Sequence, residues 1–323
     1  MGAYDPCCVS KGAGSLTEMS QRDQLYKNLS IVIPAFNEEA GLGTTLDTVL
    51  PSFPGAEIIV VDDCSSDGTS VVARKRPVRV LRHAYNCGQG AALKTGMRHA
   101  NRDWVAWYDA DNEHRPQDLA RLATRVAAGD VVAAIGQRNR STSIFRLVGK
   151  WLIRLIGRGF KINAGSDLNC GLRLFQRSVI LPYLSLIPDR FSASLVTTLI
   201  MIERRYPITF ELIETNPRIG NSSVRMKDGF EAILVLVRSV LLFAPMRFFL
   251  PMGGGLILLG GIYSLVLAYW FGHGLPIAGM LVIMVGFLAV ILGLVADQIS
   301  QLRLGQFPAR IPTQELGIGP ADE

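Results

Sequence analysis

The chain has 323 residues, of which 49% are apolar, and it carries a formal net charge of +6. This length is enough for one sizeable α/β domain together with a further element. The five cysteines are odd in number and fit no zinc-binding spacing, which argues against a small domain held by disulfides or zinc. A cytoplasmic domain would keep such thiols reduced. We expect no signal peptide, because Asp5 interrupts the amino-terminus and no apolar core follows it.

Residues 1–27 are expected to form a loose leader before an alternation of strands and helices. In chain order, the expected elements are a strand from Leu29, a helix at 42–50, a strand at 57–63, a strand at 78–81, a helix at 86–98 and a strand at 104–108. The turn at 64–69 has helix-capping residues. Such alternation predicts an α/β fold with a mainly parallel sheet wrapped by helices.

Two polar features mark the ends of these elements. The glycine-containing loop 86–92 opens an expected helix, a pattern that can bind an anion but also serves ordinary turns. Three strands end in Asn37–Glu38, Asp62–Asp63 and Asp109-x-Asp111. In an open α/β sheet the ligands lie beyond the carboxyl ends of the strands. Carboxylates that converge there are costly unless a cation or hydrogen-bond donors share the site.

Asp109 and Asp111 are two residues apart in extended chain, so their side chains point the same way. Two carboxylates on one side suit a hard divalent cation, which prefers oxygen ligands, and Glu113 continues the alternation. A single Asp-x-Asp is more often a solvated acidic turn. The convergence of three strand ends favours a metal and nucleotide site instead.

Several motifs carry a resemblance to a known family. They are Ile33–Glu38, Val61–Thr69, the Asn86-x-Gly-x-Gly loop and Asp109-x-Asp111 with His114 and Pro116. Their order and spacing resemble the family 2 glycosyltransferases, most closely the dolichol-phosphate mannosyltransferase and polyprenyl-phosphate glycosyltransferase branch. The resemblance covers about residues 28–225. It implies a nucleotide-diphospho-sugar transferase fold, which is a GT-A type, Rossmann-like domain.

The resemblance implies a donor pocket at the first two strand ends. Pro34, Phe36 and Glu38 would line the base and ribose pocket, and Asp63 would read the base. The donor would be a nucleotide-diphospho-sugar linked to GDP or UDP.

The resemblance also implies a catalytic and metal site after the fourth strand. Asp109 would contact the sugar nucleotide, and Asp111 would bind the Mg²⁺ or Mn²⁺ that bridges the diphosphate. Glu113 would join the metal shell, where the mannosyltransferases usually have Gln, and this departure leaves the metal preference and the donor open. Arg138 would lie near the donor diphosphate.

On the acceptor side, Asp167–Arg173 resembles a D-x-x-S-G-F-R segment, with Cys170 where Ser is commoner. Relatives also carry a basic, Gly/Ser-rich loop like residues 216–225, which would close on the donor and the lipid phosphate; a flexible linker is the alternative. The residues expected near the acceptor phosphate are Arg146, Asp167, Arg173, Arg218 and Ser222.

Residues 143–161 predict a basic amphipathic helix. Arg146, Lys150, Arg154 and Arg158 recur every four residues, which places the cations on one stripe between apolar residues. This pattern is typical of a helix that lies on anionic lipid, and the alternative is a core helix with a solvated basic face. Residues 181–210 are expected to be a helix pair that closes the domain, with Glu203, Arg204 and Arg205 exposed, and 230–243 an apolar interfacial helix.

Two stretches without a charge, 248–271 and 275–296, have 24 and 22 residues. At about 1.5 Å per residue each can cross a hydrocarbon core of roughly 30 Å. Only a short turn joins them, so we expect two transmembrane helices in a hairpin; a buried core hairpin is the alternative. Arginines flank the pair and none lies in the turn, which places the catalytic domain in the cytoplasm. The expected domains are therefore a leader (1–27), a catalytic domain (28–225), a connector (226–247), two spans (248–296) and a tail (297–323).

Together these features predict a multi-pass membrane glycosyltransferase. It would move a hexose, with mannose or glucose favoured, to a dolichyl or undecaprenyl phosphate with inversion. A phosphate monoester has a second pKa near 6 and is already a nucleophile at pH 7, so no dedicated base is required. We expect no nucleic-acid partner and leave a homo-oligomer open.

Two alternatives remain. One is a processive polysaccharide synthase of the same fold, but the chain lacks a Gln-x-x-Arg-Trp motif and has few spans. The other is a catalytically silent scaffold that binds nucleotide-sugars or lipid, against which the intact Asp63, Asp109 and Asp111 argue.

Overall fold

The computed structural model describes residues 24–138, 170–190, 193–216, 245–272 and 276–306. Its seven strands form one sheet. The strands are β1 (Leu29–Ala35), β2 (Glu57–Asp62), β3 (Arg79–Arg82), β4 (Trp104–Trp107), β5 (Ala133–Arg138), β6 (Arg173–Gln176) and β7 (Ile208–Ile213). The order across the sheet is β3-β2-β1-β4-β6-β5-β7.

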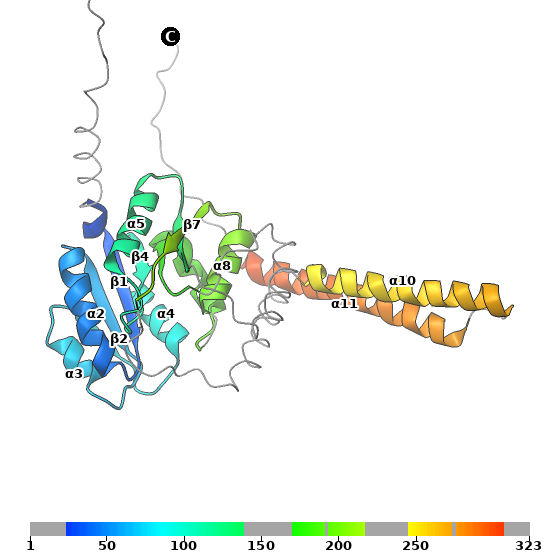
Figure 1. Cartoon of the computed structure of the whole chain (residues 1–323), viewed down its shortest axis with the longest axis horizontal. Coiled ribbons are helices and arrows are strands. Elements are labelled where there is room, and N and C mark those ends of the chain that lie inside the picture. Colours follow the sequence, from blue (N-terminus) through cyan, green and yellow to red (C-terminus); the bar gives the residue numbers. More distant parts are fainter. Residues whose placement is uncertain (1–23, 139–169, 191–192, 217–244, 273–275, 307–323) are drawn as a thin grey trace, which may run out of the picture.

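Helices cover both faces of this sheet (Figure 1). They are α2 (Glu39–Ser52), α3 (Thr69–Arg74), α4 (Gln89–His99), α5 (Pro116–Ala127), α7 (Arg177–Ile180), the 3-10 helix η2 (Leu181–Leu186) and α8 (Ala193–Glu203). Buried strand residues alternate between the two layers. Val32 and Ile59 pack in the core with α4 and α8, whereas Ile31, Ile33 and Val60 pack in the core with α2 and α5. Strands buried on both faces are expected where helices flank a mainly parallel sheet.

Strand β1 is the centre of the parallel part. It pairs in parallel with both β2 and β4, and β2 pairs in parallel with β3. The chain leaves β1 toward one side for β2 and reaches β4 on the other side, so a topological switch point lies between β1 and β4. Crevices beyond the carboxyl ends of the strands at such a point are where open α/β sheets bind ligands. The turns after β1, β2 and β4 therefore share one edge.

The expectation of a mainly parallel sheet is confirmed, with one strand as the exception. Four of the six strand pairings are parallel, and β6 runs antiparallel between β4 and β5. The first three expected strands are confirmed within one or two residues. The fourth ends at Trp107, so Asp109 and Asp111, expected in extended chain, lie beyond it at the turn 110–112, where Asn112 has a left-handed φ of 59°. Strands β5 and β6 and helix α5 were not expected.

The expectation of a helix pair over residues 181–210 fits η2 and α8 but is wrong after Glu203. Helix α8 ends at Glu203, Arg205 takes a left-handed φ of 55°, and Pro207 follows. Residues from Ile208 then form β7, which pairs with β5. The β-branched and aromatic residues Ile208, Thr209 and Phe210 fit a strand, and they close the sheet edge. Of the three charged residues expected to be exposed, only Arg205 is; Glu203 and Arg204 are half-buried.

The loose leader also needs correction at its end. Residues 24–27 form a helical turn, and Leu25 and Tyr26 are buried in the core. The Tyr26 ring meets the Phe53 ring edge to face, with 5.0 Å between centroids. The folded domain therefore begins before Leu29.

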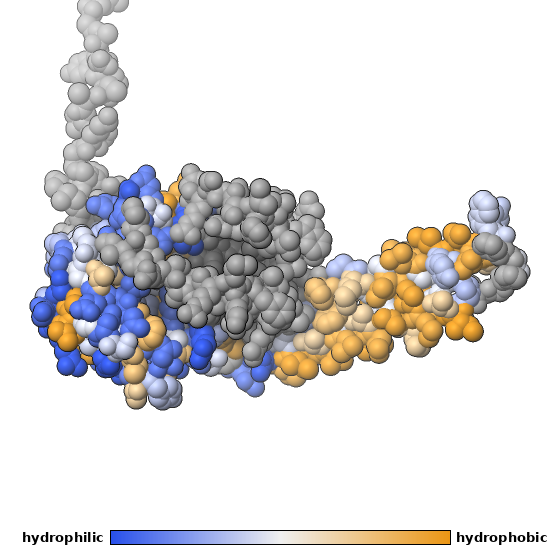
Figure 2. Space-filling model, turned by 60° about the horizontal axis from the view of Figure 1, so that its bottom comes forward, coloured by the Kyte–Doolittle hydropathy of each residue, from blue (hydrophilic) through white to orange (hydrophobic). Residues whose placement is uncertain are grey.

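Two long helices, α10 (Met246–Phe271) and α11 (Ile277–Gly305), form a hairpin that projects from the sheet domain (Figure 1). Their apolar segments have mean hydropathies of 1.8 and 2.8, and only 17% and 22% of these segments is buried. A core helix of a soluble protein would be mostly buried, so this exposure favours membrane spans. Figure 2 shows the hairpin as a mainly apolar surface beside the mainly hydrophilic coloured part of the sheet domain. Helix α11 continues beyond Ala296, where the sequence analysis ended the span.

Candidate functional site

The turns after β1 and β2 are tied together by side chains. The Asn37 N–H donates to Ser65 Oγ at 3.0 Å, and the Ser66 N–H donates back to Asn37 Oδ1 at 2.9 Å. The Glu38 N–H donates to Thr69 Oγ1 at 2.9 Å. Asn37 has a left-handed φ of 54°, which Asn tolerates better than most residues. These bonds fix the turn on which Phe36 and Glu38 lie.

The three residues expected to line a base pocket differ in solvent exposure. Phe36, just beyond β1, has 47% of its surface exposed, and Glu38 is half-buried. Pro34 is buried inside β1, where it lies opposite Val61 of β2. The structure thus brings Phe36 and Glu38 to the sheet edge and leaves Pro34 beneath it.

Asp63, expected to read a base, is nearly inaccessible, with 2% of its surface exposed. Its Oδ1 accepts the Cys87 N–H at 2.9 Å, and its Oδ2 accepts the Gly88 N–H at 2.6 Å. His83 Nδ1 lies 2.7 Å from the same Oδ1. The carboxylate therefore holds the loop before α4 in place.

Of the two alternatives for this glycine-containing loop, an anion site or an ordinary turn, the structure favours the ordinary turn. Beyond the two N–H groups bound by Asp63, the Gly90 and Ala91 N–H groups donate to the carbonyl oxygens of Arg190 and Asp189 at 3.3 and 2.8 Å. Gly88 has a φ of 102°, and a Cβ there would lie 2.6 Å from the Asp189 oxygen. The loop N–H groups are satisfied inside the protein, so none of these four points to a ligand.

Asp109 follows β4 and is held from three sides. Gln89 Nε2 donates to its Oδ1 at 3.2 Å, and His114 Nε2 lies 2.9 Å from its Oδ2. On the third side is Gly171, where a Cβ would come within 2.3 Å of Oδ2. The Asp109 side chain is 26% exposed, so the carboxylate is fixed in position yet open to a ligand.

Asp111, Glu113 and Arg138 lie beside it. Asp111 is 6% exposed and its Oδ1 accepts the Glu113 N–H at 3.0 Å. Arg138, the last residue of β5, donates from Nη1 to Glu113 Oε1 at 3.3 Å. The four residues expected to form the catalytic and metal site therefore meet at one edge, three acidic and one basic.

His114 is a site residue to which the sequence reasoning gave no role, although it lies in a quoted motif. It is 1% exposed, and Nδ1 has no hydrogen-bond partner among the described residues. Burial would lower the pKa of His114, but the hydrogen bond to Asp109 and the charges of Asp109, Asp111 and Glu113 outweigh it and raise the pKa. The Tyr108 hydroxyl donates to the His114 carbonyl oxygen at 2.6 Å and fixes the turn.

The charge balance of this cluster fits a divalent cation. Asp109, Asp111 and Glu113 offer oxygen atoms only, which hard cations such as Mg²⁺ and Mn²⁺ prefer. The raised pKa of His114 reflects the same concentration of negative charge. A bound cation would offset it.

Of the residues expected near the acceptor phosphate, only Arg173 lies in the described part of the chain. Arg173 is fully buried; Nε donates to the Cys170 carbonyl oxygen at 2.8 Å and Nη1 to Thr198 Oγ1 at 2.6 Å. Its guanidinium also lies 6.0 Å from the centroid of the Trp107 ring. This side chain stabilises the core, and its burial and hydrogen bonds argue against a role as a phosphate ligand. The other expected acceptor residues, Arg146, Asp167, Arg218 and Ser222, and the helix expected at 143–161 lie outside the described residues.

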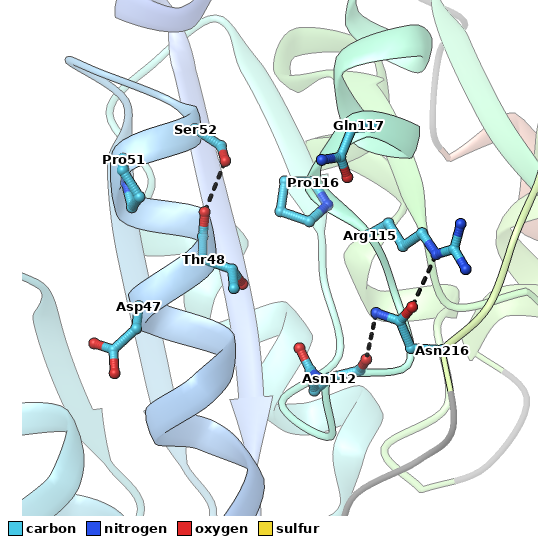
Figure 3. Close-up of a pocket in the computed structure, with 9 residues that line it drawn as sticks. All are labelled: Asp47, Thr48, Pro51, Ser52, Asn112, Arg115, Pro116, Gln117 and Asn216. Carbon is cyan, nitrogen blue, oxygen red and sulfur yellow. Dashed lines mark hydrogen bonds between the residues drawn. The ribbon is translucent and has the colours of Figure 1, made fainter.

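A cavity of about 660 Å³ lies beside the acidic cluster, between α2 and the turn that leads into α5 (Figure 3). Asn216 lies at its edge. Its Oδ1 accepts from Arg115 Nε at 2.8 Å, its Nδ2 donates to the Asn112 carbonyl oxygen at 3.4 Å, and its N–H donates to the Glu113 carbonyl oxygen at 2.9 Å. The first residue of the basic loop 216–225 is thus bound to the acidic turn. Neither Asp109 nor Asp111 lines this cavity.

Comparison with known proteins identifies two parts of the chain. Residues 30–180 match the family described as Glycosyl transferase family 2, and residues 244–302 match the GtrB C-terminal hairpin.

Curated relatives match over different lengths. The Dodecaprenyl-phosphate galacturonate synthase of Rhizobium johnstonii is 33% identical over 167 residues, which is 47% of this chain and 48% of that protein. The Undecaprenyl-phosphate 4-deoxy-4-formamido-L-arabinose transferase of Salmonella choleraesuis is 32% identical over 48% of this chain and 50% of its own. The Pseudomonas paraeruginosa protein of the same name is 28% identical over 76% and 77%. The chain thus spans about half the length of the first two relatives and about three quarters of the third.

Solved structures share the fold. Glucosyl-3-phosphoglycerate synthase from Mycobacterium tuberculosis, crystallised with Mn²⁺, uridine diphosphate and phosphoglyceric acid, superposes with a TM-score of 0.53 at 20% identity. The match covers 66% of this chain and 76% of that one. The same enzyme with Mg²⁺ and uridine diphosphate gives a TM-score of 0.54 at 19% identity, over 66% and 78% of the two chains. Residues 30–180 therefore match the family 2 glycosyltransferases, the sheet domain has a GT-A-like fold, and residues 244–302 match the GtrB C-terminal hairpin.

Proposed function

We propose that this chain transfers a sugar from a nucleotide-diphospho-sugar to a polyprenyl phosphate at a membrane surface. The observation that carries the proposal is that one chain combines an acidic cluster at the switch point of a glycosyltransferase fold with an exposed apolar hairpin. A membrane-anchored enzyme is needed when the acceptor is itself anchored in the bilayer. The curated relatives, which are named for dodecaprenyl and undecaprenyl phosphate, support this acceptor class.

The donor would lie at the carboxyl edge of β1, β2 and β4. Phe36 offers an exposed aromatic face for a base or ribose, and Glu38 follows it on the same fixed turn. Asp109, Asp111 and Glu113 would hold Mg²⁺ or Mn²⁺, and such a cation neutralises the leaving diphosphate when bound. Arg138, already paired with Glu113, adds a further positive charge on that side.

The acceptor phosphate needs no dedicated base, because it is ionised at neutral pH. The task of the protein is then to hold the two substrates in line and to exclude water. Asn216 supports an acceptor role for the loop 216–225, because its three hydrogen bonds start this loop at the acidic turn. A single displacement would invert the anomeric carbon.

The transferred sugar and the nucleotide are the finer part of the proposal. Mannose or glucose, linked to GDP or UDP, stays a prediction. The relatives are named for galacturonate and 4-deoxy-4-formamido-L-arabinose, which are neither of these sugars. A donor panel should therefore include uronic acids and amino sugars.

We also propose that the catalytic domain faces the cytoplasm, with its boundaries near residues 24 and 225. The described sheet runs from Leu29 to Ile213, and the hairpin from Met246 to Gly305. In the sequence, arginines at 238, 247, 303 and 310 flank the hairpin, and the turn between its helices has none. This distribution supports a cytoplasmic domain by the positive-inside rule.

The test is transfer of label from a panel of radioactive GDP- and UDP-sugars into extractable lipid, in membranes that contain the full chain. Asp111→Asn should reduce the incorporated label by roughly 100-fold or more, because a metal ligand is lost at the site of the leaving diphosphate. The matched control is Asp130→Asn. That side chain is 54% exposed and pairs with Arg125 at the surface, so its removal should leave transfer near the wild-type rate. Near wild-type transfer by Asp111→Asn would refute the site, and no labelled lipid from any donor would refute the function.

A further inference from the structure

A second group of possible metal ligands lies after β2 and β3, built from residues other than the Asp-x-Asp carboxylates. Asp63, His83 and Cys87 each offer one ligand atom, and these atoms all lie within 4.8 Å of one another. We propose that Asp63, His83 and Cys87 bind a zinc ion, separately from the Mg²⁺ or Mn²⁺ of the transfer reaction.

The donor set decides which cation fits. One carboxylate oxygen, one imidazole nitrogen and one thiolate sulfur suit Zn²⁺, which takes mixed N, O and S ligands with tetrahedral geometry. Mg²⁺ prefers oxygen ligands only, so it competes poorly at a thiolate. Three protein ligands leave a fourth position for water or another small ligand.

The surroundings of His83 resemble those of a metal-bound histidine. Its Nδ1 lies 2.7 Å from Asp63 Oδ1, and its Nε2 lies 2.9 Å from Thr95 Oγ1. Without a metal, Nδ1–H donates to the Asp63 carboxylate, which can only accept. A cation that binds Nδ1 would replace this proton, and Nε2–H would then donate to the threonine hydroxyl. A hydrogen-bond partner on the second ring nitrogen is what fixes the tautomer and orientation of metal-binding histidines. The His83 side chain is only 14% exposed, which limits competition from water.

The other two ligands are also held in place. The Gly88 N–H orients the Asp63 carboxylate through Oδ2 and leaves Oδ1 on the side of His83 and Cys87. The Cys87 thiol is half-buried and 3.3 Å from the Tyr85 carbonyl oxygen. The ligand atoms of Asp63, His83 and Cys87 thus converge within 4.8 Å of one another. A cation bound there would hold the thiol in its ionised form.

Sequence spacing does not reveal this group, because the three residues come from separate turns. The parallel pairing of β2 with β3 places Asp62 opposite Arg82, so the residues that follow them, Asp63 and His83, are neighbours. The loop held by Asp63 then brings Cys87 to the same place.

Inhibition of transfer by zinc is a second expected result, and it rests on the proposed function. Asp63 cannot read a base while it ligates zinc, so zinc should inhibit transfer in competition with the donor, even with Mg²⁺ in excess. Binding and inhibition are measured separately, so that failure of the proposed function does not obscure the metal site.

The binding experiment uses the full chain in detergent, stripped of metal and kept in excess Mg²⁺. Cys7 and Cys8 are replaced by Ser so that these adjacent thiols do not contribute. Zinc is titrated against a chromophoric chelator, and Co²⁺ is used as a spectroscopic substitute whose thiolate charge-transfer absorption reports a sulfur ligand. We expect one tightly bound ion per chain. Cys87→Ser should remove the thiolate absorption, and Cys87→Ser and His83→Gln should each weaken zinc binding by about 10-fold or more.

Cys64→Ser is the matched control. The Cys64 thiol lies in the neighbouring turn, 3.5 Å from the Ala84 carbonyl oxygen, and is not one of the three ligands. It should keep both the affinity and the absorption, and thermal unfolding of each variant checks that it is folded. Absence of stoichiometric zinc binding, or equal losses in Cys64→Ser and Cys87→Ser, would overturn the site. Zinc binding without inhibition would keep the site and remove Asp63 from the base pocket.

Discussion

Gly171 sets the position of the Asp109 carboxylate. A Cβ at residue 171 would lie 2.3 Å from Oδ2, too close for any real contact, and the atom it meets is the end of a side chain rather than backbone. Gly171→Ala should therefore leave the fold nearly as stable but displace Asp109 from His114 and Gln89. A displacement of about 1 Å at a reacting site can lower the rate roughly 100-fold. The measurement is initial transfer rate beside the midpoint of thermal unfolding.

Gly96→Ala is the matched comparison, because it should lower stability rather than the transfer rate. There a Cβ would lie 2.2 Å from Val32 Cγ1, between α4 and β1, far inside the core. Overpacking of this kind costs about 1–3 kcal/mol. This variant should unfold at lower temperature while the folded fraction keeps its rate per molecule. If Gly171→Ala lost stability instead of rate, the fixed position of Asp109 would not matter for the reaction.

Glu57 tests the electrostatics at the opposite end of the sheet. It accepts from Ser30 Oγ at 2.6 Å and from the Asn101 N–H at 2.8 Å. Burial would raise the pKa of Glu57, but these hydrogen bonds and the charge of Arg79 lower it overall. A folded-state pKa below the unfolded value of about 4.3 stabilises the protein fully above that value, and this stabilisation is lost as the pH falls through the folded-state pKa. Glu57→Gln should cost about 1–3 kcal/mol at pH 7.

The difference in thermal midpoint between wild type and Glu57→Gln, both measured in detergent, should shrink as the pH is lowered from 6 toward 3. Asp47→Asn is the control, because Asp47 pairs with Arg76 on the surface and is 62% exposed. Its effect at pH 7 should be much smaller. A constant difference between Glu57→Gln and wild type at all pH values would show that ionisation of Glu57 does not contribute.

At the scale of single residues, the sequence predicted the acidic cluster well. Asp109, Asp111 and Glu113 follow a buried strand that the sequence pattern predicted, so their place at the sheet edge follows from that pattern. Arg138 was named from the family resemblance, because strand β5, which it ends, was not expected. The sequence could not predict that Arg173 is buried, because a buried arginine needs acceptors such as Thr198 that are distant in sequence. His114 was also missed as a supporting residue, since its contact with Asp109 depends on the turn between them.

Among the elements, β6 shows the limit of periodicity. It has only four residues, begins with Arg173, and is buried because it inserts between β4 and β5. A short strand with a charged first residue carries too little pattern to predict. The long helices α10 and α11 are the opposite case, since more than 20 successive residues without a charge, most of them apolar, leave few alternatives.

The hairpin is packed through glycines seven residues apart. Gly253 and Gly260 on α10 meet α11, and Gly279, Gly286 and Gly293 on α11 meet α10. A Cβ at Gly286 would lie 2.8 Å from the Gly253 carbonyl oxygen, so the two backbones are in direct contact. Small residues that let backbones approach closely are a main source of helix association in membranes. Gly286→Leu should therefore separate the helices.

A disulfide can report this separation. The Ser264 Cβ lies 3.2 Å from the position of a Cβ at Gly279, close to the ~3.5–4.5 Å of disulfides. In a Ser264→Cys, Gly279→Cys background, oxidation should link the helices readily, and Gly286→Leu should lower the yield several-fold. Gly254→Leu is the control, since a Cβ there meets nothing within 4 Å among the described residues. Equal yields in both backgrounds would show that the glycine contacts do not hold the hairpin.

For the whole molecule, the arrangement of apolar surface supports a membrane orientation. The hairpin exposes Leu258, Tyr269 and Trp270 at 67%, 87% and 77%, whereas the sheet domain presents a hydrophilic face (Figure 2). Tyr269 and Trp270 lie near the tip of the hairpin, the position of an aromatic belt at the far interface. At 26 residues, α10 is about 39 Å long, enough to cross the hydrocarbon core with some tilt.

The last prediction separates the hairpin from the second membrane contact expected from the sequence. A chain that ends at residue 225 lacks α10 and α11 as well as the apolar stretch 230–243, and it should no longer be extracted with integral membrane proteins. The basic stretch 143–161, which lies outside the described residues, should still bind vesicles that contain anionic lipid. Because each Arg or Lys near such a surface contributes about 1 kcal/mol and salt screens it, this residual binding should fall steeply between low and physiological salt. Vesicle flotation measures the fraction of protein that stays bound.

Arg154→Gln with Arg158→Gln in the truncated chain should remove most of this residual binding, whereas neutral vesicles should bind neither protein. Residual binding that salt does not weaken, or no binding at all, would contradict the expected interfacial helix and leave the hairpin as the membrane attachment.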